Sequence, residues 1–227
     1  MRILALIPAR GGSKRLPGKN SIDLGGKPLI NWSIEITKEI EDICSTLVST
    51  DDETIAQIAR KTGAMVPWLR PENLSQDESS SSDVAIHALD WYESQFGKVD
   101  GLMLLQPTSP FRSKDTILSA IALFKASNYQ TIIGVSKSKD KNNLRYILKN
   151  GIITQVDERK VKNKVNKILG NLYKINGSVY LINPSEIRLY RSFHPKNSLG
   201  IVINSKKESI DIDTEADLTQ ARKALIR

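Results

Sequence analysis

The sequence predicts an α/β fold, with a Rossmann-like three-layer sandwich around a mainly parallel sheet. Short apolar runs of strand length alternate with segments whose apolar residues recur at helical spacing, up to about residue 136. This alternation is typical of right-handed crossovers between parallel strands. The length of 227 residues suits one domain with a full core and is too short for two full domains.

The first strand is predicted at residues 3–7, a nearly continuous apolar run that stops at Pro8. A polar loop follows directly, in which glycines let backbone N–H groups turn toward a bound anion. Four cationic side chains surround the same place, as a triphosphate would require: Arg10, Lys14, Arg15 and Lys19.

Two familiar phosphate-binding motifs are excluded by counting. Five residues separate Gly12 from Gly18, where the P-loop has four, and Asn20 stands where its Ser or Thr would follow the lysine. The sequence also contains no G-x-G-x-x-G. An ordinary basic surface loop between a strand and a helix is the alternative interpretation.

After this loop, helices and strands alternate, with a proline, acid or hydroxyl residue at several helix starts. The expected elements are a helix at 28–43, a strand at 46–49, a helix from Asp51 to before Gly63, a strand at 65–68, a helix that starts within 79–83, a strand at 101–105, a helix at 114–127, a strand at 131–136, strands at 177–182 and 200–203, and a final helix capped by Thr214. Pro67 places the strand at 65–68 near an edge, because proline cannot donate to the ladder. The strand at 101–105 is the most apolar, so we expect it to be central.

Four polar residues fall just after predicted strands: Arg10, Asp51, Arg70 and Gln106. In parallel α/β sheets, ligands bind outside the carboxyl ends of the strands. We therefore treat these residues as parts of one site. His87 could carry a proton, but a lone histidine on a helix is more often structural.

The alternation breaks at about 137–175, which we expect to be a basic arm inserted into the single domain 1–227. Between Lys137 and Lys174 eleven basic residues face three acidic ones, and the rest of the chain holds 22 of each sign. Asn150-Gly151 between two β-rich runs predicts a hairpin. A nucleic-acid footprint is one interpretation, but the segment has few aromatic residues and no known RNA-binding signature. A solvated arm, or one that contacts an anionic substrate, fits as well, so we expect no nucleic-acid partner.

The composition indicates no membrane partner and a cytoplasmic location. No apolar stretch approaches the roughly 20 residues that a membrane span needs, and the first eight residues do not read as a signal peptide. Cys44 is the only cysteine, which rules out an internal disulfide and a cysteine-rich zinc site.

The segment Asp211-Ile212-Asp213 predicts a metal site. Residues two apart in an extended segment point the same way, so both carboxylates share one face while Ile212 turns into the core. Carboxylate oxygens suit Mg²⁺, which also binds phosphate oxygens and water. The alternative is that Asp213 only helps to cap the last helix beside Thr214.

Five motifs, spread over nearly the whole chain, together resemble those of the acylneuraminate cytidylyltransferase family, the enzymes that activate sialic acids and related keto acids with CTP. They occur in that family's order and are residues 9–20, 69–74, 105–112, 176–180 and 209–215. The resemblance implies a nucleotidyltransferase domain whose projecting arm forms a homodimer. No single motif would be specific, but the set is.

The resemblance also implies a role for each matching residue. Arg10, Lys14 and Lys19 would bind the phosphates, and Arg10 and Lys19 would stabilise the leaving pyrophosphate. The remaining positions are the loop residues Gly11, Gly12, Ser13 and Asn20 beside the nucleotide, Arg70 and Ser81 at the cytidine, Gln106, Asn176 and Tyr180 on the sugar side, and Asp211 and Asp213 at Mg²⁺. For Tyr180, simple core packing is an alternative.

The sequence departs from the family at the arginines that bind the keto-acid carboxylate. Asn166-Lys167 and Lys174 stand at those places. A lysine can pair a carboxylate only as a point charge, without the bidentate fork of arginine. Lys167 and Lys174 are therefore candidate substrate-binding residues, and the departure concerns the identity of the sugar more than the reaction.

The expected reaction is attack of the anomeric hydroxyl of a nonulosonic acid on the α-phosphorus of CTP, with Mg²⁺. Candidate acceptors are N-acetylneuraminate, legionaminate and their relatives, and Asp211, acting through metal-bound water, is a candidate base. The alternatives are a cytidylyltransferase for 3-deoxy-manno-octulosonate or a related sugar nucleotidylyltransferase, a paralogue without turnover, and a non-enzymatic RNA- or anion-binding protein that uses the basic arm.

Overall fold

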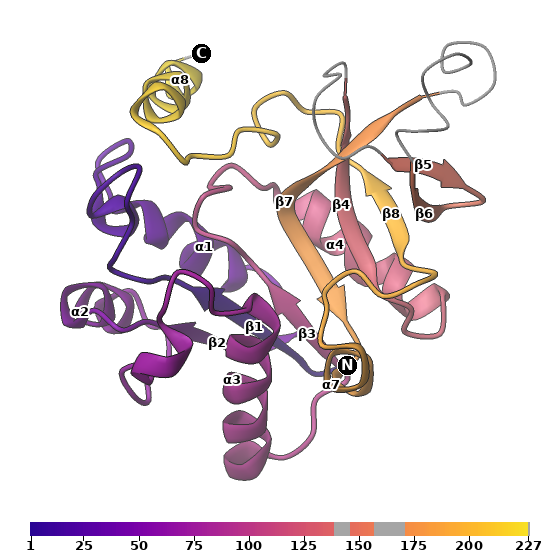
Figure 1. Cartoon of the computed structure of the whole chain (residues 1–227), viewed down its shortest axis with the longest axis horizontal. Helices are drawn as coiled ribbons and strands as arrows, with labels where there is room; N and C mark the ends of the chain where they lie inside the picture. Colours follow the sequence, from indigo (N-terminus) through magenta and orange to yellow (C-terminus); the bar gives the residue numbers. More distant parts are fainter. Residues whose placement is uncertain (139–145, 157–170, 227) are drawn as a thin grey trace.

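The computed structural model describes residues 1–138, 146–156 and 171–226. Within them, eight strands form one sheet in the order β2-β1-β3-β7-β4-β8-β6-β5 (Figure 1). The strands are β1 Ile3–Pro8, β2 Ile43–Ser49, β3 Gly101–Leu104, β4 Ile132–Lys137, β5 Tyr146–Lys149, β6 Ile152–Gln155, β7 Tyr173–Ile182 and β8 Leu199–Val202.

The helices follow the predicted order with one addition. They are α1 Leu29–Thr37, α2 Glu53–Lys61, α3 Ser81–Phe96, α4 Lys114–Ala126, α7 Pro184–Tyr190 and α8 Glu215–Leu225, with short 3₁₀ turns η1 Lys19–Ser21 and η2 Glu72–Leu74. The sequence reasoning missed α7, which Asn183 caps and Pro184 begins. The predicted strand at 65–68 is reduced to a single bridge between Leu47 and Met65.

The α/β prediction is confirmed, but the sheet is mixed rather than mainly parallel. β1 runs parallel to β2 and β3, and β4 runs parallel to β8. β7 lies antiparallel between β3 and β4. Parallel neighbours need a crossover connection, whereas the chain between β4 and β7 contains the hairpin β5–β6, so β7 returns in the opposite direction. β5 also pairs with β7, so this end of the sheet curls back on itself.

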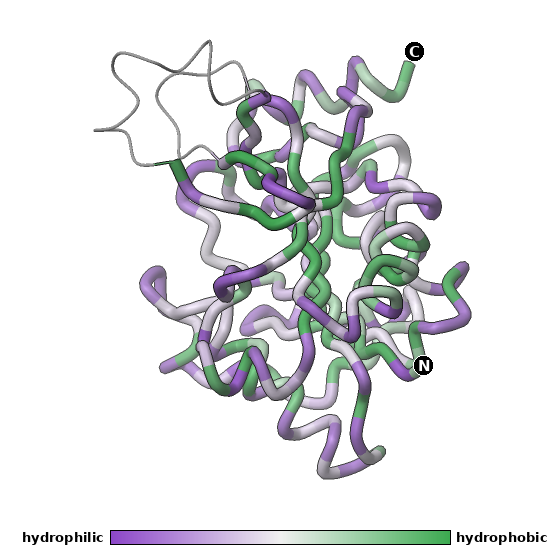
Figure 2. Tube along the Cα trace, turned by 90° about the vertical axis from the view of Figure 1, so that its right-hand side faces the viewer, coloured by the Kyte–Doolittle hydropathy of each residue, from purple (hydrophilic) through white to green (hydrophobic). Residues whose placement is uncertain are grey.

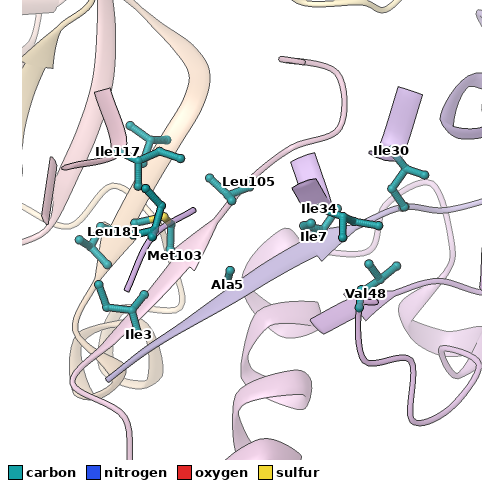
Figure 3. Packing of buried hydrophobic residues seen from close by; sticks show 14 of the residues in the cluster. Ile3, Ala5, Ile7, Ile30, Ile34, Val48, Met103, Leu105, Ile117 and Leu181 are labelled. Atoms are coloured by element: carbon teal, nitrogen blue, oxygen red, sulfur yellow. The ribbon is translucent and has the colours of Figure 1, made fainter. Parts of the chain in front are cut away.

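Helices cover both faces of the sheet. Because side chains alternate along a strand, Ile3, Ala5 and Ile7 of β1 face α1, α2 and α4, whereas Leu4 and Leu6 face α3. All five are fully buried. Figure 3 shows Ile30 and Ile34 of α1 gathered near Ile7 and Val48, with Ile117 of α4 near Met103 and Leu181. Each large side chain buried in this way contributes about 1.5–3 kcal/mol.

The hydrophobic segments run through the centre of the molecule, and the most hydrophilic segments lie at its periphery (Figure 2). A third cluster lies apart from the sheet faces, where α8 packs on the loop after β1 through Leu16, Leu24, Ile212 and Leu218. This cluster places the segment 210–213 beside the amino-terminal loop, and the Ile212 N–H donates to the Thr108 carbonyl at 2.8 Å. Chain ends that are far apart in sequence therefore meet at the carboxyl ends of β1 and β3.

Much of the predicted basic arm lies outside the described residues, which omit 139–145 and 157–170. The described part contains the predicted hairpin, β5 paired antiparallel with β6. Asn150 and Gly151 turn it with φ of 51° and 81°. Among the helices that the structure describes, none is long and apolar enough to cross a membrane.

Candidate active site

A cleft of about 520 Å³ opens where the loops after β1 and β3 meet the start of α3. Most residues predicted to hold the nucleotide line it, with one predicted sugar-side residue: Arg10, Ser13, Lys14, Lys19, Asn20, Arg70, Ser81 and Gln106. Gly11 and Gly12 lie in the same loop but are not among the lining residues. The structure thus brings the predicted nucleotide side into one concave site.

The loop after β1 is held in shape by the end of β2. The Gly11 N–H donates to Asp51 Oδ1 at 2.9 Å. A Cβ at Gly11 would lie 2.7 Å from Asp52 Oδ2, so only glycine fits this close approach. Asn20 is buried and donates from Nδ2 to the Arg10 carbonyl at 2.9 Å, which fixes the two ends of the loop together.

The four cations of the loop are shared between two carboxylates. Asp77 pairs with Arg10 (2.5 Å) and with Lys14, and these pairs hold the pKa of Asp77 below its usual value. Asp213 pairs at 2.8 Å with both Arg15 and Lys19. In these ion pairs four positive charges meet two negative ones, and this excess of positive charge in the loop suits a polyphosphate.

The pair between Lys19 and Asp213 joins the two ends of the chain. Lys19 Nζ donates to Asp213 Oδ1 across 194 residues of sequence, and the Lys19 side chain is only 13% exposed. Desolvation alone would raise the pKa of Asp213, but Lys19 and then Arg15 outweigh it and lower that pKa. The amino-terminal cationic loop and the late acidic pair therefore form one site.

Ile212 is fully buried, as the alternation of Asp211, Ile212 and Asp213 predicts. Asp211 keeps access to solvent, but the protein around it desolvates its carboxyl group and raises its pKa, and the Asp213 charge acts in the same direction. A hydrogen bond from Thr108 and the charge of Lys19 oppose this rise. Asp211 is thus held beside the cleft in a polar but crowded setting.

The described residues contain no cluster of three or more His, Cys, Asp or Glu side chains that could hold a metal ion by itself. Two carboxylates still fit Mg²⁺, which usually keeps several waters and completes its coordination with phosphate oxygens. The two oxygens of Asp213 accept hydrogen bonds from the cationic side chains of Lys19 and Arg15, so positive charge already lies where a divalent cation would bind. The donor set therefore fits Mg²⁺ together with a bound triphosphate.

Arg70 is buried at the end of β2. It donates from Nε to Ser49 Oγ at 3.0 Å and from Nη2 to the Ser49 carbonyl. Burial lowers its pKa, an effect that Asp51 opposes. Ser81 is exposed at the start of α3, beside the N-cap Ser80. Both predicted cytidine contacts thus line the cleft.

A second cavity of about 290 Å³ adjoins the first, and Gln106 and Ser81 line both. Tyr180 lines the second cavity, is 7% exposed and stacks on His194 with ring centroids 5.6 Å apart. Burial, followed by the charge of Asp211, raises the pKa of Tyr180. The two cavities thus adjoin at Gln106 and Ser81.

Two other predicted sugar-side residues, Asn176 and Lys174, do not line either cavity. Asn176 is 5% exposed, and its amide is used internally: Nδ2 donates to Ser136 Oγ and Oδ1 accepts from Ser178 Oγ, both at 2.8 Å. Lys174 is exposed on β7 opposite Ser136. Lys167 lies outside the described residues. The contacts of these residues with a sugar stay predictions.

Sequence reasoning missed several residues that shape the site. Asp77 lies in a polar stretch without periodicity, and only its pairing with Arg10 and Lys14 in space reveals it. His194 follows a helix that was not predicted. His87, in contrast, packs edge-on against Trp68 with ring centroids 4.9 Å apart, in agreement with a structural rather than a catalytic role.

Comparison with known proteins agrees with this geometry. The model of the family described as cytidylyltransferase matches residues 4–225. The chain is 38% identical to the CMP-N,N'-diacetyllegionaminic acid synthase of Legionella pneumophila, over 99% of this chain and 97% of that protein. It is 33% identical to the pseudaminic acid cytidylyltransferase of Campylobacter jejuni (98% and 95%), and 34% identical to the N-acylneuraminate cytidylyltransferase of Escherichia coli (97% of this chain, 51% of that protein).

The fold is similar to a solved CMP:2-keto-3-deoxy-manno-octonic acid synthetase complexed with CTP, with a TM-score of 0.82 over 100% of this chain and 99% of that chain. At 18% identity, this likeness concerns the fold alone. The resemblance seen in the five motifs is confirmed by the full-length relatives. The chain belongs to the cytidylyltransferase family.

Proposed function

We propose that this protein transfers the cytidylyl group of CTP to the anomeric hydroxyl of a nonulosonic acid. The hydroxyl oxygen forms a bond to the α-phosphorus, the bond between that phosphorus and the β-phosphate oxygen breaks, and the products are a CMP-sugar, pyrophosphate and a proton. The observation that carries this proposal is the meeting of the cationic loop with the acidic segment, at the 2.8 Å pair between Lys19 and Asp213.

The loop would bind the triphosphate by exchanging partners. In the free protein Arg10 and Lys14 pair with Asp77, and Lys19 pairs with Asp213. A triphosphate as a whole carries more negative charge than these carboxylates, and its oxygens can replace them as acceptors. Arg10 and Lys19 would then stabilise the charge that grows on the departing pyrophosphate, as preorganised donors do elsewhere.

The same exchange would free Asp213. Without Lys19 as a partner, Asp213 Oδ1 and the carboxylate of Asp211 would be available to hold Mg²⁺ against the phosphates. When bound, Mg²⁺ neutralises phosphate charge and helps to orient the α-phosphate. Asp211 is the candidate for accepting the proton of the attacking hydroxyl.

The remaining contacts follow from position. Arg70 and Ser81 on the cleft wall would bind the cytidine, with Gly11, Gly12, Ser13 and Asn20 shaping the loop around the nucleotide. Gln106 and Tyr180 line the adjoining cavity, which we assign to the acceptor sugar. Lys167, Lys174 and Asn176 complete the proposal as residues that support the sugar side.

The acceptor class rests on the relatives, whose names specify legionaminic, pseudaminic and N-acylneuraminic acids. All three are nine-carbon keto acids. The second candidate acceptor is 3-deoxy-manno-octulosonate, which the fold likeness to a synthetase for that sugar favours.

We further propose a cytoplasmic homodimer in which the arm at about 137–175 forms the contact. The strongly basic charge of this arm supports an association with an acidic surface or an anionic substrate. Size-exclusion chromatography with light scattering tests the dimer, and a monomer at working concentration contradicts it.

The direct test is pyrophosphate release with CTP, Mg²⁺ and a panel of sugars: N-acetylneuraminate, N,N'-diacetyllegionaminate, pseudaminate and 3-deoxy-manno-octulosonate. Turnover is expected with a nonulosonic acid, and Asp211→Asn is expected to abolish it without unfolding the protein. Turnover with the octulosonate alone supports the second candidate. Absence of turnover with all four sugars, together with salt-dependent polynucleotide binding that survives Asp211→Asn, supports the hypothesis of a non-enzymatic RNA- or anion-binding protein instead.

A further inference from the structure

Arg112 is a buried cation that forms no ion pair with any residue that the structure describes. It is 4% exposed, and burial lowers its pKa to about 9, although the charges of Asp211 and Glu208 act in the opposite direction. Burying a charge without a direct carboxylate partner is unfavourable. A side chain kept in such a place must supply something that an apolar residue could not.

What the guanidinium supplies is three divergent hydrogen bonds. Nη1 donates to Ser33 Oγ of α1 at 2.7 Å, and Nε donates to the Ser178 carbonyl of β7 at 2.8 Å. Nη2 donates to the Gln106 carbonyl at 2.6 Å. Arg112 thus ties the turn after β3 to a helix on one side and to an inner strand of the sheet on the other.

The residue held by the third bond, Gln106, lies at the junction of the two cavities and lines both. Its carbonyl also accepts from the Ser109 N–H at 3.2 Å, which closes the turn. Its side chain lies against Gly177 of β7, where φ is 73° and an added Cβ would lie 2.7 Å from Gln106 Oε1. Arg112 therefore holds the backbone of Gln106, and the absence of a side chain at Gly177 leaves room for Gln106 Oε1.

We propose that Arg112 is a positioning residue that acts through Gln106, and that it aligns the acceptor in the second cavity with the nucleotide in the first. This inference rests on the proposed function. A lysine at this position cannot reproduce three divergent hydrogen bonds from one planar group, so Arg112→Lys keeps the charge but loses the alignment. The nucleotide contacts in the proposed function come from the loop after β1, Arg70 and Ser81, so CTP binding depends on this turn less than acceptor binding does.

A double-mutant cycle tests the proposal. Arg112→Lys, Gln106→Ala and the double variant are compared by kcat/KM for the acceptor, by the dissociation constant for CTP and by melting temperature. Arg112→Lys is expected to lower kcat/KM for the acceptor by about 10-fold to 100-fold, the scale of a misplaced contact. The CTP dissociation constant is expected to change by less than about 3-fold. Because both residues act as one unit, the double variant should match Gln106→Ala within about 3-fold.

The proposal is overturned if the double variant loses kcat/KM by the product of the two single losses, or if Arg112→Lys weakens CTP binding as much as it lowers kcat/KM for the acceptor. Either result indicates a general effect of Arg112 on the fold. Arg60→Lys is the matched control, since Arg60 lies on the exposed side of α2 and pairs only with Glu53 among charged groups of the described residues. Its kinetics should equal those of the wild type.

If Arg112→Lys does not fold, Ser33→Ala decides the question, because it removes the hydroxyl that accepts from Arg112 Nη1 and Ser33 lines neither cavity. It should lower acceptor kcat/KM and spare CTP binding, and wild-type values for both contradict the proposal. An inactive wild-type protein would refute the proposed function instead, so the two failures are distinguishable.

Discussion

Lys19 and Arg15 form a matched pair of cations on one carboxylate. Both donate to Asp213 at 2.8 Å, but the Lys19 side chain is 13% exposed and that of Arg15 is 68% exposed. Replacing each in turn by methionine removes one positive charge and keeps an unbranched apolar side chain. The distance from the charged nitrogen to the Asp213 oxygen is the same for both residues. The two variants therefore differ chiefly in how strongly water screens the charge that each one removes.

The two variants should therefore differ strongly in rate. A preorganised, desolvated donor that faces developing charge is worth about 2.7–4 kcal/mol, which corresponds to about 10²-fold to 10³-fold in kcat. An exposed cation in an ion pair contributes about 0–1 kcal/mol, which is at most about 5-fold. We predict losses of these sizes for Lys19→Met and Arg15→Met, measured as pyrophosphate release at saturating CTP and sugar.

Salt sharpens the comparison. The small effect of Arg15→Met should shrink further at about 1 M salt, where the Debye length is about 3 Å, whereas the effect of Lys19→Met should persist. Melting temperatures serve as the control for folding. Equal losses for the two variants, or a larger loss for Arg15→Met, would refute the argument that burial in the cleft makes Lys19 the effective cation.

Three further predictions concern the loop, the fold and the metal. Gly11→Ala places a Cβ 2.7 Å from Oδ2 of Asp52, the N-cap residue of α2, and should lower the free energy of unfolding by about 1 kcal/mol and weaken CTP binding. Gly12→Ala, whose Cβ would meet nothing within 4 Å, should change neither the free energy of unfolding nor CTP binding. Equal effects of the two variants in calorimetry contradict this prediction. Burial acts to raise the pKa of Glu93, but Lys98, the Val99 N–H and Arg188 together outweigh burial and lower this pKa below the ordinary value of 4.5. The stabilising effect of the Glu93 carboxylate is therefore present above pH 4.5 and is lost as the pH falls through the lower pKa of the folded protein. Glu93→Gln should thus cost about 1–2 kcal/mol in urea unfolding at pH 7 and less once the pH falls below the folded pKa, and a difference that does not change with pH contradicts this. Removal of Mg²⁺ by EDTA should abolish turnover but leave the melting temperature unchanged, because Lys19 and Arg15 already neutralise Asp213; full activity in excess chelator contradicts this.

The elements that sequence could predict are those with a strong local pattern. The apolar run of β1, the Asn150-Gly151 turn and the alternation of Asp211, Ile212 and Asp213 each depend on spacing that is visible in the chain. The cleft could be anticipated for the same reason, because residues that follow parallel strands gather at one edge of a sheet.

The remaining features depend on long-range packing. The direction of β7 follows from the hairpin that precedes it, and its apolar run alone does not encode direction. Asp77 joins the site only through ion pairs with Arg10 and Lys14. Asn176 matches a sugar-side motif, yet its amide bonds Ser136 and Ser178, and a residue pattern cannot reveal that internal use.

A crystal structure with CTP and Mg²⁺ tests the central claim most directly. We predict that the triphosphate lies between the loop and the acidic segment. Lys19 Nζ and an Arg10 nitrogen should lie within about 3.2 Å of phosphate oxygens, and the Asp211 carboxylate should face the α-phosphate. Binding of the nucleotide elsewhere, or a Lys19 that stays on Asp213 while CTP is bound, would contradict it.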